Sequence, residues 1–262
     1  MNIILHKYHG AGNDFLLIDN RESKVHLSTA QIAHLCHRNF GIGADGLMLL
    51  ENDTHHDFKM VYFNSDGNQS TMCGNGGRCI VLFAHHLGVI KNSTTFTAID
   101  GEHQASINAD DTVSLHMIDV HTILLDKTYY EINTGSPHYV KFTNDVEGIN
   151  VTIDGANIRN QAKYMPNGIN VNFVQIISEN TLKIRTYERG VENETLACGT
   201  GVTAAAIAYY IKAQITSSTL TVAVQARGGN LSVALHFNGN NSFDNIVLTG
   251  PAQRVFAVEY SL

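Results

Sequence analysis

The sequence predicts a mixed α/β (α+β) fold of two similar, pseudo-symmetric lobes, each a curved, mostly antiparallel sheet around a central apolar helix. The pattern Cys-Gly-x-Gly occurs twice, at 73–76 and 198–201, and the copies lie 125 residues apart in a chain of 262. Each copy leads into a long, almost purely apolar stretch, and most of the remaining chain consists of short strand-like runs separated by turn signals. Two homologous halves that each present one thiol are the simplest explanation.

The two apolar stretches predict helices over residues 75–87, ending near Gly88, and over residues 200–212. A helix that is apolar on nearly every face must be buried on every side. We therefore expect each helix to lie at the centre of its own half, surrounded by that half's sheet.

Runs rich in β-branched and aromatic residues predict the strands. Representative runs are Phe15–Ile18, Met60–Phe63, Val171–Ile176 and Leu220–Val224. Clusters of Gly, Asn and Asp predict turns at Ser65–Asn68 and Phe237–Asn240. The duplication predicts an N-terminal lobe over residues 1–125, which we expect the terminal strand, residues 251–262, to join, and a C-terminal lobe over residues 126–250.

The repeat extends beyond the cysteines. Tyr62 precedes Cys73 by 11 residues, and Tyr187 precedes Cys198 by the same 11. Each tyrosine follows a strand-like run and precedes a glycine turn. Further upstream, Gly12-Asn13-Asp14-Phe15 has a weaker counterpart in Gly135-Ser136-Pro137-His138.

Charge and composition limit the classes of partner. The net charge is -7 and the chain has no run of Lys or Arg, which argues against nucleic acid or a membrane surface as a partner. No segment approaches the roughly 20 apolar residues of a membrane span, and the N-terminus lacks a signal-peptide layout. We expect a cytoplasmic protein that binds a small molecule.

The four cysteines are too few and too irregularly spaced for a disulfide-stapled domain. The chain has no Cys-x-x-Cys motif, the pattern typical of zinc sites and of thioredoxin-type redox sites. Cys36 is expected to pack in a helix capped by Ser28, on one face with Ile32 and Leu35. Cys79 falls inside the first apolar helix and is also expected to be inert packing.

A cysteine at a helix N-terminus can act as a base. The positive end of the helix dipole and the unpaired first-turn N–H groups favour the thiolate over the thiol. Gly74 and Gly199 follow Cys73 and Cys198 directly, so the amides of each first turn are open to a ligand carboxylate. Two such helix ends could hold a carboxylate with its α-carbon between the two sulfurs. One thiolate would remove the α-proton and the opposite thiol would deliver another, which inverts the carbon without a cofactor.

Other interpretations of the two cysteines remain open. They could form a structural or regulatory disulfide, and oxidation of a catalytic pair would also inactivate it. A thiol-redox protein would cycle a disulfide with a reductase. A non-catalytic binding module would exchange no proton at a substrate carbon.

Nine motifs, seen together and in order, resemble the diaminopimelate epimerase family along nearly the whole chain. They are His9–Phe15, Gly41–Gly46, Phe63–Gly67, Met72–Gly76, Gly135–His138, Asn170–Phe173, Tyr187–Gly190, Ala197–Gly201 and Leu248–Ala252. The resemblance implies interconversion of LL- and meso-2,6-diaminopimelate, a step toward lysine and peptidoglycan precursors, with no cofactor and no metal. It also implies two lobes that close over an active-site cleft, and a homodimer.

The resemblance also assigns roles to residues of this chain. It implies that Cys73 and Cys198 are the acid/base thiols, and that His138 and Glu188 assist catalysis. It implies that the substrate is held by Asn13, Asn64, Gly74, Asn75, Asn170, Glu188, Arg189, Gly199 and Thr200. Chemically, a distal carboxylate suits Arg189 and amide donors, and an ammonium group suits the Glu188 carboxylate.

The chain departs from the family pattern in three places. Ser136 stands where many members carry asparagine, Gly46 stands where some carry glutamine and is left out of the site, and the segment 190–195 is one residue longer than the commonest form. A related two-cysteine enzyme such as proline racemase is the alternative within the same chemistry. It would not need Glu188, Arg189 and Asn64. Phe256, in the apolar terminal segment, is the expected dimer contact.

Overall fold

The computed structural model describes residues 2–262, which form two compact units. Unit 1 comprises residues 2–115 and Pro251–Leu262, and unit 2 comprises His116–Gly250. The chain therefore leaves unit 1, builds unit 2 without interruption and returns to unit 1 for its last segment.

Unit 1 has two α-helices and nine strands. The helices are α1 (Thr29–Cys36) and α2 (Gly74–His86). The strands are β1 (Asn2–Gly10), β2 (Asn13–Asp19), β3 (Gly46–Glu51), β4 (Phe58–Asn64), β5 (Gln69–Ser70), β6 (Ser93–Ala98), β7 (Gly101–Ile107), β8 (Val113–His116) and β18 (Gln253–Ser261). They pair in the order β18-β1-β2-β3-β4-β6-β7-β8, with β5 also on β4. The pairs β2–β3 and β4–β6 are parallel, and the other pairs are antiparallel.

Unit 2 repeats this plan. Its helices are α3 (Val151–Arg159), the short 3-10 helix η1 (Ala162–Tyr164) and α4 (Gly199–Lys212). Its strands are β9 (Ile123–Leu125), β10 (Tyr130–Asn133), β11 (Pro137–Phe142), β12 (Asn170–Ser178), β13 (Thr181–Glu188), β14 (Asn193–Thr195), β15 (Thr219–Ala226), β16 (Gly229–Gly239) and β17 (Ser242–Gly250). They pair in the order β9-β10-β11-β12-β13-β15-β16-β17, with β14 on β13 and parallel pairs at β11–β12 and β13–β15. Strand order and direction thus match those of unit 1.

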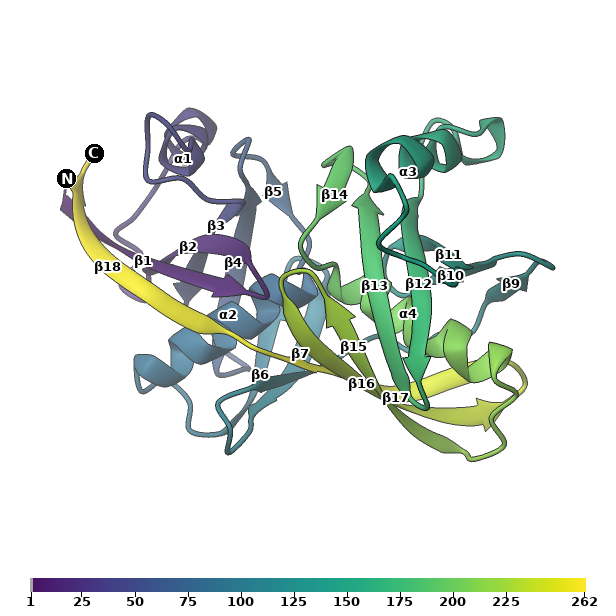
Figure 1. Cartoon of the computed structure of the whole chain (residues 1–262). Helices are drawn as coiled ribbons and strands as arrows, with labels where there is room; N and C mark the ends of the chain where they lie inside the picture. The colour runs from purple at the N-terminus through teal and green to yellow at the C-terminus, as the bar shows by residue number, and fades with distance from the viewer. Residues whose placement is uncertain (1) are drawn as a thin grey trace. The chain divides into compact units, whose positions relative to one another are not determined.

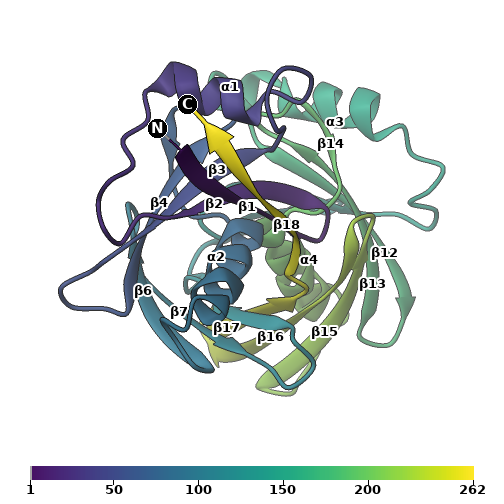
Figure 2. The same ribbon diagram turned by 90° about the vertical axis from the view of Figure 1, so that its left-hand side faces the viewer.

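Each unit encloses one apolar helix. Helix α2 contacts β1, β2, β3, β7 and β18, and Figure 2 shows it surrounded by strands. It is buried from its first residue through Ala84. Helix α4 contacts β10 to β13 and β15 to β17, and Figure 1 shows it beside β12 and β13. Its first twelve residues are buried apart from Thr200. The expected central helices and their ends are confirmed.

The registers place the two weaker repeat segments at equivalent positions. In unit 1, Phe15 of β2 pairs with Gly46 of β3. In unit 2, His138 of β11 pairs with Asn170 of β12, and both pairs belong to parallel neighbours. The segments ending in Phe15 and His138 therefore occupy the same place in their respective sheets.

The four representative strand predictions are confirmed, and Ser28 caps α1 as expected. Two other expectations need correction. Helix α3, capped by Asn150, was not predicted, because β-branched residues and an interior glycine obscure its helical pattern. The turn predicted at Phe237–Asn240 begins too early, because β16 continues to Gly239 and the hairpin turns at Asn240 and Asn241, both with positive φ.

Candidate active site

Cys73 is the N-cap of α2. Its backbone is extended (φ -112°, ψ 150°), and its Sγ accepts a hydrogen bond from the Gly76 N–H at 3.3 Å. Gly74 and Asn75 form the first turn, and both are buried. Because the first amides of a helix have no acceptor within it and lie at the positive end of its dipole, the start of α2 can bind an anion beside the thiol.

The last glycine of each Cys-Gly-x-Gly motif permits a close approach. A Cβ at Gly76 would lie 3.1 Å from the Sγ of Cys73. A Cβ at Gly201 would lie 2.4 Å from Asn172 Oδ1 and 3.3 Å from His138 Cε1. The first glycine of each motif leaves the helix amides accessible, whereas the last glycine makes room for the side chains next to it.

A chain of hydrogen bonds links the side chains beside Cys73. Asn75 Nδ2 donates to Asn13 Oδ1 at 3.3 Å, and Asn13 Nδ2 donates to Asp45 Oδ2 at 2.5 Å. Arg38 Nη2 in turn donates to Asp45 Oδ1 at 2.6 Å. Each amide in this chain has its orientation set by the next group. The structure therefore brings together two of the predicted substrate-binding asparagines.

Arg78 is fully buried in α2, one turn beyond Asn75. It donates hydrogen bonds to Asn75 Oδ1 at 2.7 Å, to the Gly74 carbonyl at 3.0 Å and to the Pro251 carbonyl at 3.3 Å. Burial lowers the pKa of Arg78, whereas its charge interactions with Cys79 and Cys73 act in the opposite direction. Within residues 2–262 its hydrogen-bond acceptors are all uncharged oxygens, so its positive charge lies near the start of α2 without a carboxylate partner.

Asn64 is the last residue of β4, opposite Gly46 of β3, and is exposed. Its backbone N–H donates to the Asn68 carbonyl at 2.9 Å in the turn that follows. The structure gives Asn64 no hydrogen bond to the other predicted site residues of the described chain. Its role in substrate binding stays a prediction.

Cys198 is the N-cap of α4, as Cys73 is of α2, and is 8% exposed. Gly199 and Thr200 open the helix. The Sγ of Cys198 lies 3.4 Å from Thr200 Oγ1, within hydrogen-bond distance for sulfur. The start of α4 therefore also combines a thiol with open-ended helix amides.

His138 is fully buried next to this helix start. Its Nε2 lies 2.9 Å from Thr200 Oγ1, and its Nδ1 lies 3.1 Å from Asn172 Nδ2. Burial lowers the pKa of His138 to about 3, and the Arg189 cation acts in the same direction. The imidazole is therefore neutral near pH 7. The Thr200 hydroxyl lies within hydrogen-bond distance of both this imidazole and the Cys198 sulfur.

Asn170 links three other segments of unit 2. Its Nδ2 donates to Ser136 Oγ at 2.7 Å and to the Pro137 carbonyl at 3.1 Å, and its Oδ1 accepts from the Arg189 backbone N–H at 2.9 Å. Arg189 Nη1 donates to the Asn167 carbonyl at 3.3 Å. Ser136, one of the departures from the family pattern, thus holds Asn170.

Glu188 ends β13 and pairs with Asn193 of β14. The longer segment that follows is held by Glu192, whose Oε2 accepts from the Tyr187 hydroxyl at 3.0 Å and whose Oε1 accepts from the Gly190 N–H at 3.0 Å. Arg159 forms an ion pair with the same carboxylate at 3.0 Å. These contacts tie the loop to β13 and α3.

The other two cysteines pack in the core. Cys36 and Cys79 are buried free thiols. Burial raises the pKa of Cys36 to about 12 and raises the pKa of Cys79 further still. Both are therefore protonated near pH 7, which agrees with their expected role as packing residues.

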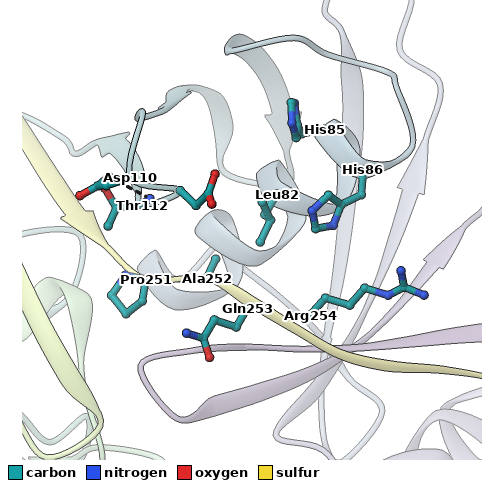
Figure 3. Close-up of a pocket in the computed structure, with 10 residues that line it drawn as sticks. Leu82, His85, His86, Asp110, Thr112, Pro251, Ala252, Gln253 and Arg254 are labelled. Atoms are coloured by element: carbon teal, nitrogen blue, oxygen red, sulfur yellow. Dashed lines mark hydrogen bonds between the residues drawn. The ribbon is translucent and has the colours of Figure 1, made fainter.

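A pocket of about 490 Å³ lies elsewhere in unit 1, between the second half of α2, the β7–β8 turn and the start of β18 (Figure 3). Its lining is Leu82, His85, His86, Asp110, Asp111, Thr112, Pro251, Ala252, Gln253 and Arg254. The acidic pair and Arg254 give it mixed charge, and none of the predicted site residues lines it. The predicted site residues therefore lie outside this pocket.

Two further findings apply to residues 2–262. None of their helices combines the length and apolar composition needed to span a lipid bilayer. No three of their His, Cys, Asp or Glu side chains are grouped so that they could hold a metal ion.

The structure thus groups Cys73, Asn75 and Asn13 in unit 1, and Cys198, Thr200 and His138 in unit 2. The buried residues that orient these groups, Arg78 and Asn172, were not predicted from the sequence. Two signals could have found them. Arg78 is the single charged residue in an apolar helix, and Asn172 lies two residues after Asn170, on the same face of a buried strand.

A comparison with protein families and curated proteins gives consistent matches. The family model described as diaminopimelate epimerase matches residues 5–123 and 130–255. The chain is 55% identical to the diaminopimelate epimerase of Flavobacterium psychrophilum, over 96% of this chain and 98% of the relative. It is 42% identical to the diaminopimelate epimerase of Chlorobaculum tepidum, over 94% and 97%.

Solved structures share the fold at low sequence identity. A PhzF-family phenazine biosynthesis protein from Bacillus anthracis matches with a TM-score of 0.78 and 14% identity, over 100% of both chains. A hydroxyproline epimerase from Agrobacterium vitis, with bound trans-4-hydroxy-L-proline, matches with a TM-score of 0.70 and 13% identity, over 98% of this chain and 92% of the other. The mixed α+β fold, mostly sheet around two buried helices, is confirmed.

Proposed function

Because the chain belongs to the diaminopimelate epimerase family, we propose that it interconverts LL- and meso-2,6-diaminopimelate by transferring an α-proton between Cys73 and Cys198. The observation that carries the proposal is the placement of each cysteine of the repeated motif as the N-cap of a buried helix. A thiol beside open helix amides is the arrangement that acid/base chemistry next to a carboxylate requires.

The proposed reaction needs one base and one acid. The thiolate of one cysteine removes the α-proton, and the charge that develops on the α-carbon spreads into the reacting carboxylate. The first-turn amides at Gly74, Asn75, Gly199 and Thr200 stabilise that charge, since they are fixed before the reaction begins. The other cysteine, as a thiol, delivers a proton to the opposite face. The roles exchange in the reverse direction, so both sulfurs must reach the same carbon during turnover.

We assign the remaining predicted residues by charge and donor type. Arg189 and the asparagine amides of Asn13, Asn64 and Asn170 suit carboxylates, whereas the Glu188 carboxylate suits an ammonium group. Substrate recognition then requires a second amino-acid end, which diaminopimelate supplies and proline does not. His138 assists Cys198 through Thr200, as their hydrogen bonds suggest.

Isotope incorporation tests the proposal. LL-diaminopimelate incubated with the protein in D2O should gain deuterium at one α-carbon as the meso isomer appears, which mass spectrometry and chiral chromatography measure together. Proline and trans-4-hydroxy-L-proline in the same assay distinguish the related racemase chemistry. Inversion of those compounds without inversion of diaminopimelate would overturn the substrate assignment, and no exchange at any carbon would favour a binding module.

We further propose that the enzyme acts in the cytoplasm, in lysine and peptidoglycan precursor biosynthesis, as a homodimer. The dimer proposal is supported by β18, which pairs with β1 along one side and is exposed along almost its whole length. Val255, Phe256 and Val258 present apolar side chains there, at 55%, 41% and 37% exposure. An apolar edge strand of this length is typical of a protein interface.

A charge placed on that strand tests the dimer. Phe256→Glu should convert a dimer to a monomer, because the carboxylate would lose its hydration in the interface. Ile153→Glu is the matched control, since Ile153 is an exposed apolar residue of α3 in unit 2. Light scattering after size exclusion gives the mass of each variant. A wild-type monomer would contradict the proposal, as would a Phe256→Glu dimer.

A further inference from the structure

Asn172 is a fully buried amide, the third residue of β12, and its orientation is determined by its neighbours. The Thr186 hydroxyl donates to Asn172 Oδ1 at 3.0 Å. Asn172 Nδ2 faces the Tyr139 carbonyl at 3.0 Å and His138 Nδ1 at 3.1 Å. A carbonyl oxygen can only accept, so the Nδ2 end of the amide must be the donor on that side.

This orientation determines the protonation of His138. Because Asn172 Nδ2 donates, His138 Nδ1 must accept, and an imidazole that accepts at Nδ1 and is neutral carries its proton on Nε2. Burial keeps the imidazole neutral near pH 7. His138 Nε2–H is then the donor to Thr200 Oγ1 across the 2.9 Å contact.

The direction continues to Cys198. A hydroxyl that accepts from His138 Nε2–H still has its own proton to donate, and Cys198 Sγ lies 3.4 Å from Thr200 Oγ1. A hydrogen bond donated to sulfur favours the thiolate over the thiol. The contacts therefore form one directed relay, Thr186 to Asn172 to His138 to Thr200 to Cys198.

Gly201 lets the start of α4 lie close to Asn172 and His138. Gly201 follows Thr200, and a Cβ there would lie 2.4 Å from Asn172 Oδ1. Any larger residue would push the start of α4 away from Asn172 and His138. The last glycine of the second Cys-Gly-x-Gly motif thus permits the approach that the relay needs.

We propose that Asn172 is a positioning residue for the reaction, which holds His138 in its Nε2–H tautomer so that the Thr200 hydroxyl donates to the Cys198 sulfur. The inference rests on the proposed role of Cys198 as an acid/base group. It goes beyond that role by assigning the direction of every hydrogen bond behind the sulfur. It also explains why the residue is an amide, since an aspartate of the same shape could only accept from Nδ1 and would move the histidine proton there.

The isosteric variant Asn172→Asp tests the direction. In the wild type, ¹⁵N NMR of histidine-labelled protein should show His138 neutral and protonated at Nε2 across pH 6–9, with its signals assigned by comparison with His138→Asn. In Asn172→Asp the proton should occupy Nδ1, and the new carboxylate should bring the His138 titration into this range. A wild-type His138 protonated at Nδ1 would overturn the proposal.

Activity supplies the second readout. In Asn172→Asp, at pH values above the pKa of His138, the imidazole carries its proton on Nδ1 and none on Nε2. The Thr200 hydroxyl then donates to His138 Nε2 instead of to the Cys198 sulfur. At pH values above the new His138 titration, we expect kcat to fall about tenfold or more, with partial recovery at lower pH. KM should stay within about threefold of wild type, because Asn172 is fully buried. The charge next to His138 is that of Arg189, after β13. Its hydrogen-bond partners are Thr200 and Asn172, and Cys198 lies beyond Thr200 at the start of α4. A folded variant with wild-type kcat at every pH would overturn the proposal.

Three further variants keep the test decisive. Thr200→Val removes the last hydroxyl but keeps the helix amide and the side-chain shape, so kcat should fall as in Asn172→Asp even if the latter fails to fold. Thr200→Ser keeps a hydroxyl at this position and should have a kcat close to that of the wild type. A Thr200→Val enzyme with wild-type kcat would overturn the relay. Tyr209→Phe removes a buried hydroxyl of α4 that bonds Asn180 outside the relay, and should leave kcat unchanged. If the wild type does not epimerise diaminopimelate, the proposed function fails, whereas the NMR result still decides the tautomer.

Discussion

Arg78 Nη2 donates a 2.7 Å hydrogen bond to Asn75 Oδ1, and this contact turns the Nδ2 end of the Asn75 amide toward Asn13. Burying a cation costs free energy unless a negative charge lies close to it. The hydrogen-bond partners of Arg78 are uncharged oxygens, including the carbonyls of Gly74 and Pro251. The charge is available to a carboxylate bound at the helix start.

Arg78→Met should therefore weaken substrate binding more than it weakens folding. The variant keeps most of the side-chain volume but removes both the charge and the clamp on Asn75, so we expect KM for diaminopimelate to rise about tenfold or more. Steady-state kinetics measure the change, with far-UV circular dichroism and Tm as controls for folding. An unchanged KM in a folded variant would show that Arg78 serves packing alone.

Replacing either catalytic candidate should abolish inversion. In Cys73→Ala or Cys198→Ala one face of the α-carbon loses its acid or base, so we expect kcat to fall at least about a thousandfold in both directions. Cys36→Ala is the matched control, because its thiol is buried in the core and protonated. Epimerisation retained by either variant would contradict the two-thiol mechanism.

Gly76→Ala should lower kcat without lowering Tm. The new methyl would lie 3.1 Å from Cys73 Sγ and in ordinary contact with Met48, so the sulfur must shift by a few tenths of an ångström. A helical alanine is favoured over glycine by about 1 kcal/mol, which should maintain or raise Tm. The displaced thiol should lower kcat about tenfold. A loss of Tm together with unchanged kcat would contradict this account.

The pH dependence of stability should include Asp14. Burial alone would raise the pKa of Asp14, but hydrogen bonds from Arg38 and Lys7 outweigh it and lower the pKa to about 2. Because the folded pKa is below the unfolded value, Asp14 stabilises the fold above about pH 4, and this contribution is lost as the pH falls through about 2.

Asp14→Asn should therefore reduce the free energy of unfolding at pH 7 by about 1–2 kcal/mol, allowing for solvent screening on the open side of the cluster. The difference from wild type should shrink as the pH approaches 2. Urea titrations followed by far-UV circular dichroism, at pH 7 and near pH 2.5, measure it. An equal difference at both pH values would point to a cause other than ionisation of Asp14.

The central helices were predictable because their physical signals are local. Uninterrupted apolar residues predict burial on every side, and the cysteine and glycine that open each run predict the cap, so both helix starts were placed within one residue. Helix α3 was not predictable in this way. Gly155 lies in its interior because a Cβ there would be 2.4 Å from Tyr187 Cβ, a packing requirement that only the fold reveals.

The side chains of the candidate site could be proposed from the sequence, but the buried residues that orient them could not. The resemblance named Thr200 and His138, and the structure places the Thr200 hydroxyl between the Cys198 sulfur and the His138 imidazole. Arg78 and Asn172 escaped notice because their function depends on which atoms they face. Whether Asn172 donates to His138 depends on the hydroxyl of Thr186 on a neighbouring strand, and no pattern along the chain encodes that direction.

The return of β18 to unit 1 has a consequence for biosynthesis. Residues 116–250 are contiguous, so all segments of unit 2 are present once Gly250 has left the ribosome. Unit 1 is begun first, yet it lacks the partner strand of β1 and the Pro251 carbonyl that holds Arg78 until the last segment emerges. The thiol of Cys198 can thus gain its native surroundings before the thiol of Cys73, although Cys73 is synthesised 125 residues earlier.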